Sequence, residues 1–496
     1  MPEQKPNISS FLLALISGGL LPLALAPFSW WPTAIFSTFI LSFLCRGQSI
    51  RTVFSLALVF GLGLYGVGTS WVYVSIHDYG NASIELAGQL TALFTFGMAI
   101  IFALPLSLFG LFRNAPPIAA TLAFPALWVL GEWMRSWFLT GFPWLNIGYG
   151  FIDTWIAGWA PLFGVMALSG FIVFCGALCA LLIEYSQSRQ VIGGGLIAVL
   201  FICAGGAYLR TTNWSSPSGK PINVALVQPD LPLLEKWKDD ELKKILVNFQ
   251  QTNETLLDQD LIVWPESAIP TLKSNIEGFL DDIHINLKEQ HVALITGIPI
   301  NTSANRYYNS VVGLGRASGT YYKRRLVPFG EYVPLEQWLR GTIAFFDLPM
   351  SAFSAGAARQ EPIQVGSLQI APAICYEIAY PDLLAKDSRD ANILLTVSND
   401  TWFGNSIGPH QHLQMARMRA LENAKPLLRA TNDGITAVID QRGKIREQLP
   451  RFEAGILKAE VTPFSGSSPF SRYGSLPIVG LSFAILIMLR LFRRFR

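Results

Sequence analysis

LQIAPAICYEIAYPD, residues 368–382, sets the architecture of the second half of the chain. Its first part is an apolar run that ends at Cys375, and Tyr376 and Glu377 follow directly. We predict a strand over 363–375 because the run is rich in apolar and β-branched residues. Cys375 is the only cysteine in this half, so it has no disulfide partner there and is a candidate reactive thiol; the others lie in apolar runs elsewhere (Cys45, Cys175, Cys179, Cys203).

Short β-branched runs alternate with amphipathic stretches on both sides of this strand. The other predicted strands cover 222–228, 261–265, 292–300, 308–315 and 392–398, and the predicted helices cover 235–258, 273–289 and 410–424. This alternation indicates a layered α/β fold. Neither GxGxxG nor a GxxxxGK loop occurs, so we expect no nucleotide cofactor.

Two more residues that could take part in catalysis, a carboxylate and an amine, follow predicted strands. Glu266 comes after LIVWP (261–265), and Lys323 comes after GTYY (319–322). Taken singly, each has an ordinary explanation as a loop charge in contact with solvent. Because side chains at strand ends can converge on one rim of an α/β fold, the two residues and Cys375 together predict an active site.

Residues 1–209 have the composition of a membrane bundle. The whole chain is 51% hydrophobic and only 14% charged, and the acidic residues are concentrated after position 209. One membrane helix needs about 20 mostly apolar residues. We predict eight spans, at 10–27, 30–45, 52–74, 86–112, 116–134, 157–183, 191–208 and 476–491. Pro27 argues against cleavage of the first span as a signal peptide.

Basic residues predict the orientation of these spans. Arg46, Arg51, Arg113 and Arg189 fall in one set of loops with the basic C-terminus, and the opposite loops hold almost no Lys or Arg. By the positive-inside rule the termini are cytoplasmic. We therefore expect transmembrane helices 1–7 over 1–209, an extracytoplasmic domain over 210–475, and helix 8 with a basic tail over 476–496. The net charge of +3 is small and scattered, so no nucleic-acid partner is expected.

The loop 136–155 is rich in aromatic residues, Trp144 among them. Such residues can anchor a protein at the membrane interface. They can also form a mouth for lipids beneath the soluble domain, and both interpretations stay open. Glu132 and Arg135, three residues apart at the end of a predicted helix, are expected to pair with each other.

Three motifs resemble those that carry the Glu, Lys and Cys of the nitrilase superfamily: WPES (264–267), YKRRLVPFGEYVP (322–334) and ICYEIAYPD (374–382). With the eight spans, the whole chain resembles the bacterial apolipoprotein N-acyltransferases, which are membrane-bound members of that superfamily. SNDTWFG (398–404) and PHQHLQMARMRALE (409–422) are similar to further stretches of those enzymes. The resemblance implies a membrane α-helical bundle joined to a nitrilase-like αββα sandwich.

The residue types suit acyl transfer through a thioester. Cys375 is the expected nucleophile, Glu266 the base that takes its proton, and Lys323 the cation that stabilises the oxyanion. The backbone N–H of Tyr376 is expected to assist Lys323. Expected supporting carboxylates are Glu331 and Glu377, and expected substrate-lining residues are Trp237, Trp402 and Trp144.

By resemblance, the acyl donor is a phospholipid, with phosphatidylethanolamine as the expected donor. The acceptor is the N-terminal α-amino group of S-diacylglyceryl cysteine in an apolipoprotein, and the location is the bacterial inner membrane with the catalytic domain in the periplasm.

We expect no metal, because His410 and His412 lie two apart on a predicted helix and point to different sides.

Two alternatives stay open on the sequence alone. A membrane-anchored amidase or nitrilase would use the same three residues with water as the acceptor. A transporter or scaffold could carry an inactive nitrilase-like domain. The aromatic membrane part favours lipid substrates over the first alternative, and retention of all three catalytic residues argues against the second.

Overall fold

The computed structural model describes residues 6–232, 235–302, 306–334 and 352–492. Internal contacts divide the chain into two units. A helical unit comprises Met1–Tyr73, Glu85–Asn213 and Tyr473–Arg496, and an α/β unit comprises Val74–Ile84 and Trp214–Arg472. The tail 493–496, whose charges entered the orientation prediction, lies outside the described residues.

Each predicted span overlaps an apolar helix: α1 (Ile8–Leu20), α2 (Pro32–Cys45), α3 (Ile50–Gly68), α5 (Ile84–Ser107), α6 (Pro117–Arg135), α8 (Val165–Glu184), α9 (Arg189–Leu209) and α16 (Leu476–Phe492). Among the described residues, five helices are long and apolar enough to cross a membrane: α3, α5 with its extension to Phe112, α6, α8 and α9. The other three are apolar but shorter. This chain is a membrane protein, and the predicted helical membrane region is confirmed.

Within the helical unit, α1 packs against α2 and α3, α8 packs against α2 and α6, and α16 packs against α6. Glu132 and Arg135 are buried at the end of α6. Glu132 accepts a hydrogen bond from the backbone N–H of Ile147 at 3.2 Å, and Arg135 donates to Oδ1 of Asn146 at 2.8 Å. Both side chains thus satisfy polar groups of the segment that follows α6, and their pairing with each other stays a prediction.

Two β-sheets form the centre of the α/β unit. The strand order in the six-stranded sheet is β14 (Gly455–Val461), β2 (Ile222–Gln228), β3 (Leu261–Val263), β4 (Ala293–Asn301), β5 (Tyr307–Gly315) and β7 (Thr320–Tyr322). The strand order in the seven-stranded sheet is β13 (Ile445–Gln448), β12 (Ala437–Ile439), β11 (Leu427–Thr431), β10 (Ile393–Ser398), β9 (Leu368–Ile374), β8 (Ile363–Val365) and β6 (Ala317–Ser318). In the centres of the sheets, β2–β3–β4 and β9–β10–β11 are parallel.

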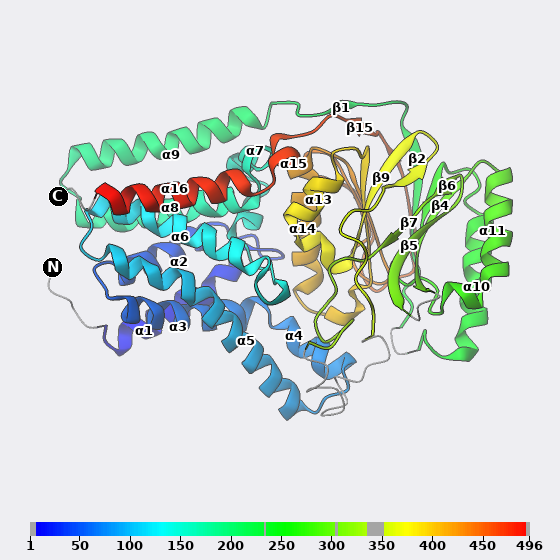
Figure 1. Cartoon of the computed structure of the whole chain (residues 1–496), viewed down its shortest axis with the longest axis horizontal. Coiled ribbons are helices and arrows are strands. Elements are labelled where there is room, and N and C mark those ends of the chain that lie inside the picture. The colour runs from blue at the N-terminus through cyan, green and yellow to red at the C-terminus, as the bar shows by residue number, and fades with distance from the viewer. Residues whose placement is uncertain (1–5, 233–234, 303–305, 335–351, 493–496) are drawn as a thin grey trace. The chain divides into compact units, whose positions relative to one another are not determined.

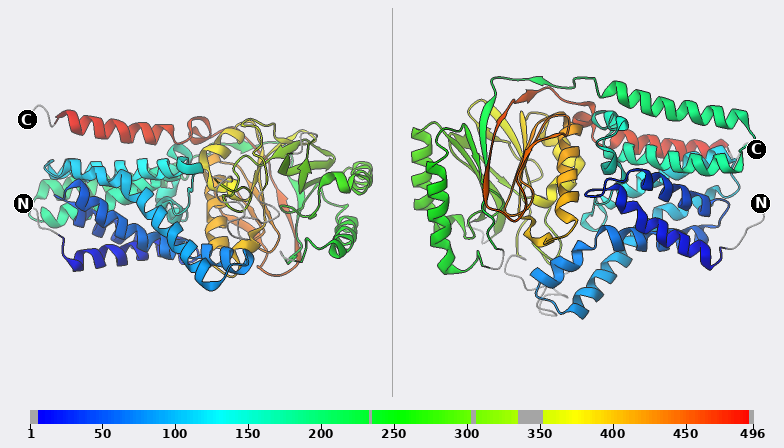
Figure 2. Two further views of the ribbon diagram at one scale, coloured as in Figure 1. Left: turned by 60° about the horizontal axis from the view of Figure 1, so that its bottom comes forward. Right: turned by 180° about the vertical axis from the view of Figure 1, so that it is seen from behind.

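The two sheets pack face to face over one apolar core, in which Leu226 and Val263 of one sheet join Ile374 and Leu395 of the other. A second core lies between the six-stranded sheet and α10 (Asp239–Glu254) with α11 (Glu277–Glu289). Helices α13 (Pro381–Asp387) and α14 (Gly408–Asn423) cover the outer face of the seven-stranded sheet (Figure 1), and Figure 2 shows the same four layers from two other sides. The predicted αββα sandwich is confirmed.

The region 363–375 differs from its prediction. It is a hairpin of β8 and β9, with Ile363 opposite Ile370, and not one strand. Gly366 makes the turn with φ +59°, a left-handed conformation that favours glycine. Apolar composition alone could not reveal the turn, because both arms of the hairpin are apolar. Cys375 lies just past β9 and begins a short 3-10 helix, Cys375–Ala379.

Candidate active site

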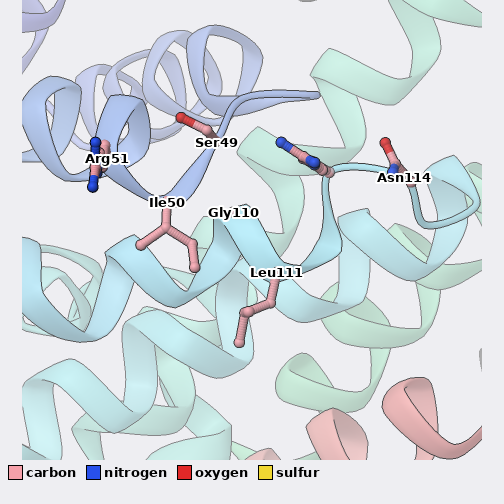
Figure 3. Close-up of a pocket in the computed structure, with 7 residues that line it drawn as sticks. Ser49, Ile50, Arg51, Gly110, Leu111 and Asn114 are labelled. Atoms are coloured by element: carbon pink, nitrogen blue, oxygen red, sulfur yellow. The ribbon is translucent and has the colours of Figure 1, made fainter.

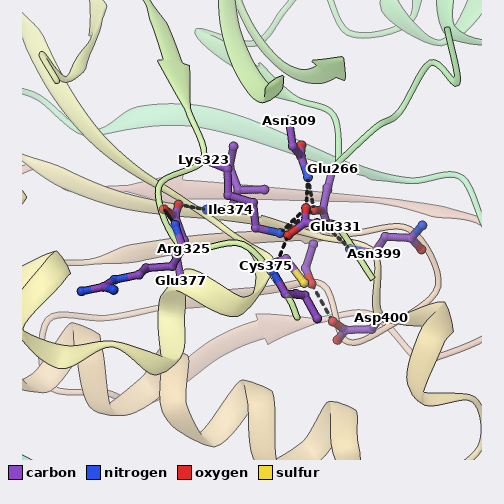
Figure 4. A network of polar contacts seen from close by, with 12 residues as sticks. Glu266, Asn309, Lys323, Arg325, Glu331, Ile374, Cys375, Glu377, Asn399 and Asp400 are labelled. Atoms are coloured by element: carbon purple, nitrogen blue, oxygen red, sulfur yellow. Dashed lines mark hydrogen bonds and ion pairs between the residues drawn. The ribbon is translucent and has the colours of Figure 1, made fainter. Parts of the chain in front are cut away.

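Glu266, Lys323 and Cys375 follow β3, β7 and β9 and lie in one polar cluster (Figure 4). Gly297 of β4 allows the Glu266 loop to lie directly on its strand. A Cβ atom at Gly297 would come within 2.6 Å of the carbonyl oxygen of Pro265 and 2.7 Å of Cα of Glu266. A larger residue at position 297 would therefore displace the predicted base.

Lys323 is held between two carboxylates. Its Nζ donates to Oε1 of Glu331 at 2.8 Å and to Oε1 of Glu266 at 3.2 Å. The side-chain amide of Asn309 donates to the same two oxygens, at 2.8 Å and 2.7 Å. All four side chains are buried, and Lys323 is only 1% exposed. The cluster therefore fixes the ammonium group and both carboxylates in one geometry.

The electrostatics of the cluster favour a permanent cation and a neutral resting thiol. Burial alone would lower the pKa of Lys323, but Glu266 and Glu331 outweigh it and raise the pKa above its usual value. Burial, followed by the charge of Glu266, raises the pKa of the Cys375 thiol, and Lys323 opposes this shift. The thiol is therefore protonated at rest, so reaction requires a base at the moment of attack.

The backbone of Cys375 is unusual. Its φ of +50° lies in the left-handed region, which non-glycine residues rarely adopt. Such strain persists only where the surroundings hold it, and it is common at active sites. In a tight turn between a strand and a helix, the N–H of the residue after the nucleophile can serve as an oxyanion donor, and here that residue is Tyr376.

The two residues after Cys375 make different contacts: Glu377 forms hydrogen bonds, and Tyr376 packs against another ring. The Glu377 carboxylate is fully buried and accepts from the backbone N–H of Ile374 at 2.8 Å and of Arg324 at 2.7 Å. It also accepts from the Tyr321 hydroxyl at 2.9 Å. These contacts connect the segment after β7, which carries Lys323, to the end of β9. The ring of Tyr376 packs edge-on against Tyr380, with centroids 5.3 Å apart.

The sequence analysis named Trp402 of the loop after β10 but did not identify Ser398, Asn399 or Asp400 as site residues. The backbone N–H of Asn399 donates to Oε2 of Glu266 at 2.8 Å, so Glu266 is held by three neighbours. Ser398 hydrogen-bonds the Cys375 thiol and donates to Asp400 Oδ1 at 2.6 Å. The available signal was the SNDTWFG motif, which directly follows a predicted strand. Asn309 carried no comparable signal, because a polar residue inside a strand is common.

Two of the predicted substrate-lining tryptophans lie in the α/β unit. Trp237 is 37% exposed, and its ring lies 5.8 Å from Nζ of Lys236. Trp402 is half-buried, and its carbonyl accepts from the Ser75 hydroxyl at 2.7 Å. Its ring meets Tyr79 at 6.2 Å. The short segment Val74–Ile84, between α3 and α5, is therefore part of the α/β unit and supports the Trp402 loop.

Trp144 belongs to the helical unit, whereas the other candidates belong to the α/β unit. It is fully buried, with ring centroids 5.2 Å from Trp71 and 5.9 Å from Phe142.

In the described part of the chain, no group of three or more His, Cys, Asp or Glu is arranged to hold a metal ion.

A pocket of about 460 Å³ lies in the helical unit between the start of α3 and the residues that follow α5 (Figure 3). Its lining residues are Ser49, Ile50, Arg51, Gly110, Leu111, Arg113 and Asn114, none of them a predicted site residue.

Comparison with known proteins covers nearly the whole chain. The family model for the apolipoprotein N-acyltransferase N-terminal domain matches residues 17–178, and that for carbon-nitrogen hydrolases matches 223–466. Among solved structures, yeast Nit3 of the nitrilase superfamily is 20% identical with a TM-score of 0.39, over 50% of this chain and 93% of its own.

Relatives that match nearly the whole of this chain share one name. The apolipoprotein N-acyltransferase of Azotobacter vinelandii is 45% identical over 97% of this chain and 95% of its own length. That of Pseudomonas aeruginosa is 44% identical over 99% of this chain and 98% of its own. The chain therefore belongs to the apolipoprotein N-acyltransferase family, the membrane-bound acyltransferases of the nitrilase superfamily.

Proposed function

We propose that this acyltransferase works through a thioester on Cys375, with Glu266 as the general base and Lys323 as the oxyanion-stabilising cation. The observation that carries the assignment is the buried Lys323, bonded to Glu266 and Glu331 beside a thiol in a left-handed turn. This arrangement supplies a base, a fixed positive charge and a nucleophile within one cluster, as acyl transfer requires.

In the first step, Glu266 takes the proton from the Cys375 thiol as the sulfur attacks the ester carbonyl carbon of a phospholipid. The carbonyl oxygen becomes an oxyanion, which Lys323 and the backbone N–H of Tyr376 stabilise. One such donor contributes about 3–4 kcal/mol to transition-state stabilisation. The carbon–oxygen ester bond then breaks, Glu266 returns the proton to the leaving alkoxide, and a lysophospholipid departs.

In the second step, a neutral α-amino group attacks the thioester carbonyl. Glu266 accepts a proton from the attacking amine, the carbon–sulfur bond breaks, and the thiolate is reprotonated. The product is an amide, and the enzyme returns to its starting state, which gives ping-pong kinetics. Glu331 keeps Lys323 oriented through both steps, since its carboxylate is the nearer of the two partners of the lysine.

The proposed donor is phosphatidylethanolamine, and the proposed acceptor is S-diacylglyceryl cysteine at the N-terminus of an apolipoprotein. We assign the catalytic domain to 210–475 on the periplasmic side of the inner membrane, with transmembrane helices in 1–209 and 476–496. Trp237 and Trp402 are proposed to contact the acyl chains, because both are aromatic residues that are at least partly exposed. We propose the same for Trp144 in the helical unit, on its aromatic loop alone.

Intact mass spectrometry tests the proposal directly. The purified enzyme is incubated with phosphatidylethanolamine beside a Cys375→Ala variant, and a diacylglyceryl peptide with a free amine is then added. We expect a mass gain of one acyl chain on the wild type only, which the peptide amine discharges. An adduct on both proteins, or no adduct with turnover intact, would overturn the assignment of Cys375.

A further inference from the structure

His412 connects a buried ion pair to the backbone of Cys375. Its Nε2 lies 3.1 Å from the carbonyl oxygen of Cys375, and its Nδ1 lies 3.0 Å from Oδ1 of Asp400. The ring is completely buried on α14, and Phe403 meets it edge-on at 5.8 Å. The imidazole therefore joins the turn that holds the nucleophile to the loop after β10.

The partner of Nε2, the carbonyl oxygen of Cys375, shows that this nitrogen carries a hydrogen. A backbone carbonyl oxygen can only accept, so Nε2 must donate to Cys375. On the opposite side, burial tends to raise the pKa of Asp400, but Arg429 and His412 outweigh it and hold the pKa well below its usual range. Asp400 is thus an ionised acceptor that faces Nδ1 and fixes the plane of the ring.

Asp400 is itself rigidly held. Its Oδ2 accepts from Nη2 of Arg429 at 2.5 Å, and its Oδ1 accepts from the Ser398 hydroxyl at 2.6 Å. Arg429 donates in turn from Nε to the carbonyl of Ile435 at 3.1 Å, and its Nη2 lies 3.2 Å from His412 Nδ1. Asp400, His412 and Arg429 are all 0% exposed, so neither water nor side-chain rotation competes with these contacts.

We propose that His412 is a positioning residue that holds Cys375 in its left-handed turn and thereby aims the Tyr376 N–H at the developing oxyanion. The inference rests on the proposed role of Cys375 as the nucleophile. Rotation of the Cys375 carbonyl would change the direction of the next N–H, because the two belong to one planar peptide unit. A donor fixed on that carbonyl therefore fixes the oxyanion donor as well.

The same geometry shows that His412 is not the base. Its Nε2 faces a carbonyl, and its Nδ1 faces the Asp400 carboxylate and the Arg429 guanidinium. Glu266 instead interacts electrostatically with the thiol. A buried His–Asp–Arg group could instead serve only to attach α14 to the sheet. The two roles make different predictions, because attachment depends on filled space and paired charge, while positioning depends on the donor to Cys375.

A pair of variants of similar shape separates these roles. His412→Gln places an amide nitrogen near the position of Nε2 and keeps a donor, and His412→Met fills similar space without one. Both lose the contact of the imidazole with Asp400. The readouts are the maximal rate of Cys375 acylation by phosphatidylethanolamine, its KM for that donor, and the melting temperature. His410→Gln, a half-buried position two residues earlier on α14, is the control.

We expect His412→Met to acylate about 100-fold more slowly than His412→Gln at saturating donor, because misplaced oxyanion donors cost about that much. The KM and the melting temperature should agree within the pair, and His410→Gln should match the wild type. Equal rates in the Gln and Met variants, whether both slow or both normal, would overturn the inference.

If neither variant folds, Asp400→Asn gives the same readout. A lower maximal rate with unchanged KM supports positioning, and an unchanged rate refutes it. Failure of the proposed nucleophile is distinguishable, because the wild type itself would then carry no acyl group on Cys375.

Discussion

The side-chain amide of Asn309 donates a hydrogen bond of 2.7 Å to Oε1 of Glu266, and the same nitrogen lies 2.8 Å from Oε1 of Glu331. Asn309 thus connects the proposed base to the second carboxylate, as Lys323 also does. One ammonium group and one amide face the oxygens of both carboxylates and offset the repulsion between them. Asn309 is therefore as much a part of the site as the residues that the motifs identify.

We predict that Asn309→Asp lowers kcat at neutral pH by about 100-fold, within the range that general-base catalysis contributes. The change replaces a donor with a third carboxylate, which repels Glu266 and Glu331 and disturbs the geometry in which they hold Lys323. Asn309→Ala, which removes the amide without adding charge, should lower kcat by less. Equal kcat values for the two variants would contradict the assignment.

Lys323→Met should lower kcat by about 100- to 1,000-fold, as expected when one oxyanion-stabilising group is lost. It should also destabilise the fold by about 3–5 kcal/mol, because Glu266 and Glu331 lose the cation between them. The double variant Lys323→Met, Glu331→Gln separates these effects. It removes the like-charge repulsion, so the melting temperature should recover while turnover does not. Recovery of turnover in the double variant would show that Lys323 acts only through stability.

The sequence predicted the layers, and it predicted that three polar residues at strand ends lie together, because both depend on local patterns. Strand β2 matches its predicted range of 222–228, and Glu266, Lys323 and Cys375 each follow a strand. The hairpin at Gly366 was missed because apolar residues fill both arms. Asn309, Asp400 and His412 were missed as site residues because their roles come from contacts between segments far apart in the chain, such as Asn399 with Glu266.

Glu377→Gln should destabilise the protein by about 2–4 kcal/mol. Oε1 of Glu377 accepts from the N–H groups of Arg324 and Arg325, and Oε2 accepts from the N–H of Ile374 and the hydroxyl of Tyr321. In either orientation of a glutamine amide, its NH2 group would face a backbone donor. Chemical denaturation in detergent would measure the loss.

The control is Glu361→Gln, which changes an exposed carboxylate of the same unit and should leave the free energy of unfolding within about 0.5 kcal/mol. Equal stability of Glu377→Gln and Glu361→Gln would show that the four contacts of Glu377 contribute little.

Lys236 is a second buried cation of the site, only 2% exposed, whose Nζ donates to the carbonyl of Ser267 at 3.1 Å. Burial lowers its pKa from 10.5 to about 8, although Glu266 and Asp433 oppose the shift. A lowered lysine pKa means that the unfolded chain binds the proton more tightly than the folded protein. The buried Lys236 cation therefore lowers the free energy of unfolding. This destabilisation is fully present below about pH 8, and it disappears as the pH rises towards 10.5.

We predict that Lys236→Met unfolds at higher denaturant concentration than the wild type at pH 7, and that this advantage shrinks by up to about 3 kcal/mol by pH 10. Comparing the two proteins at each pH cancels the titration of all other groups that the substitution leaves unchanged. Lys243→Met, at an exposed position on α10, should show a difference that is the same at both pH values. A constant difference for Lys236→Met would mean that burial does not penalise the Lys236 cation.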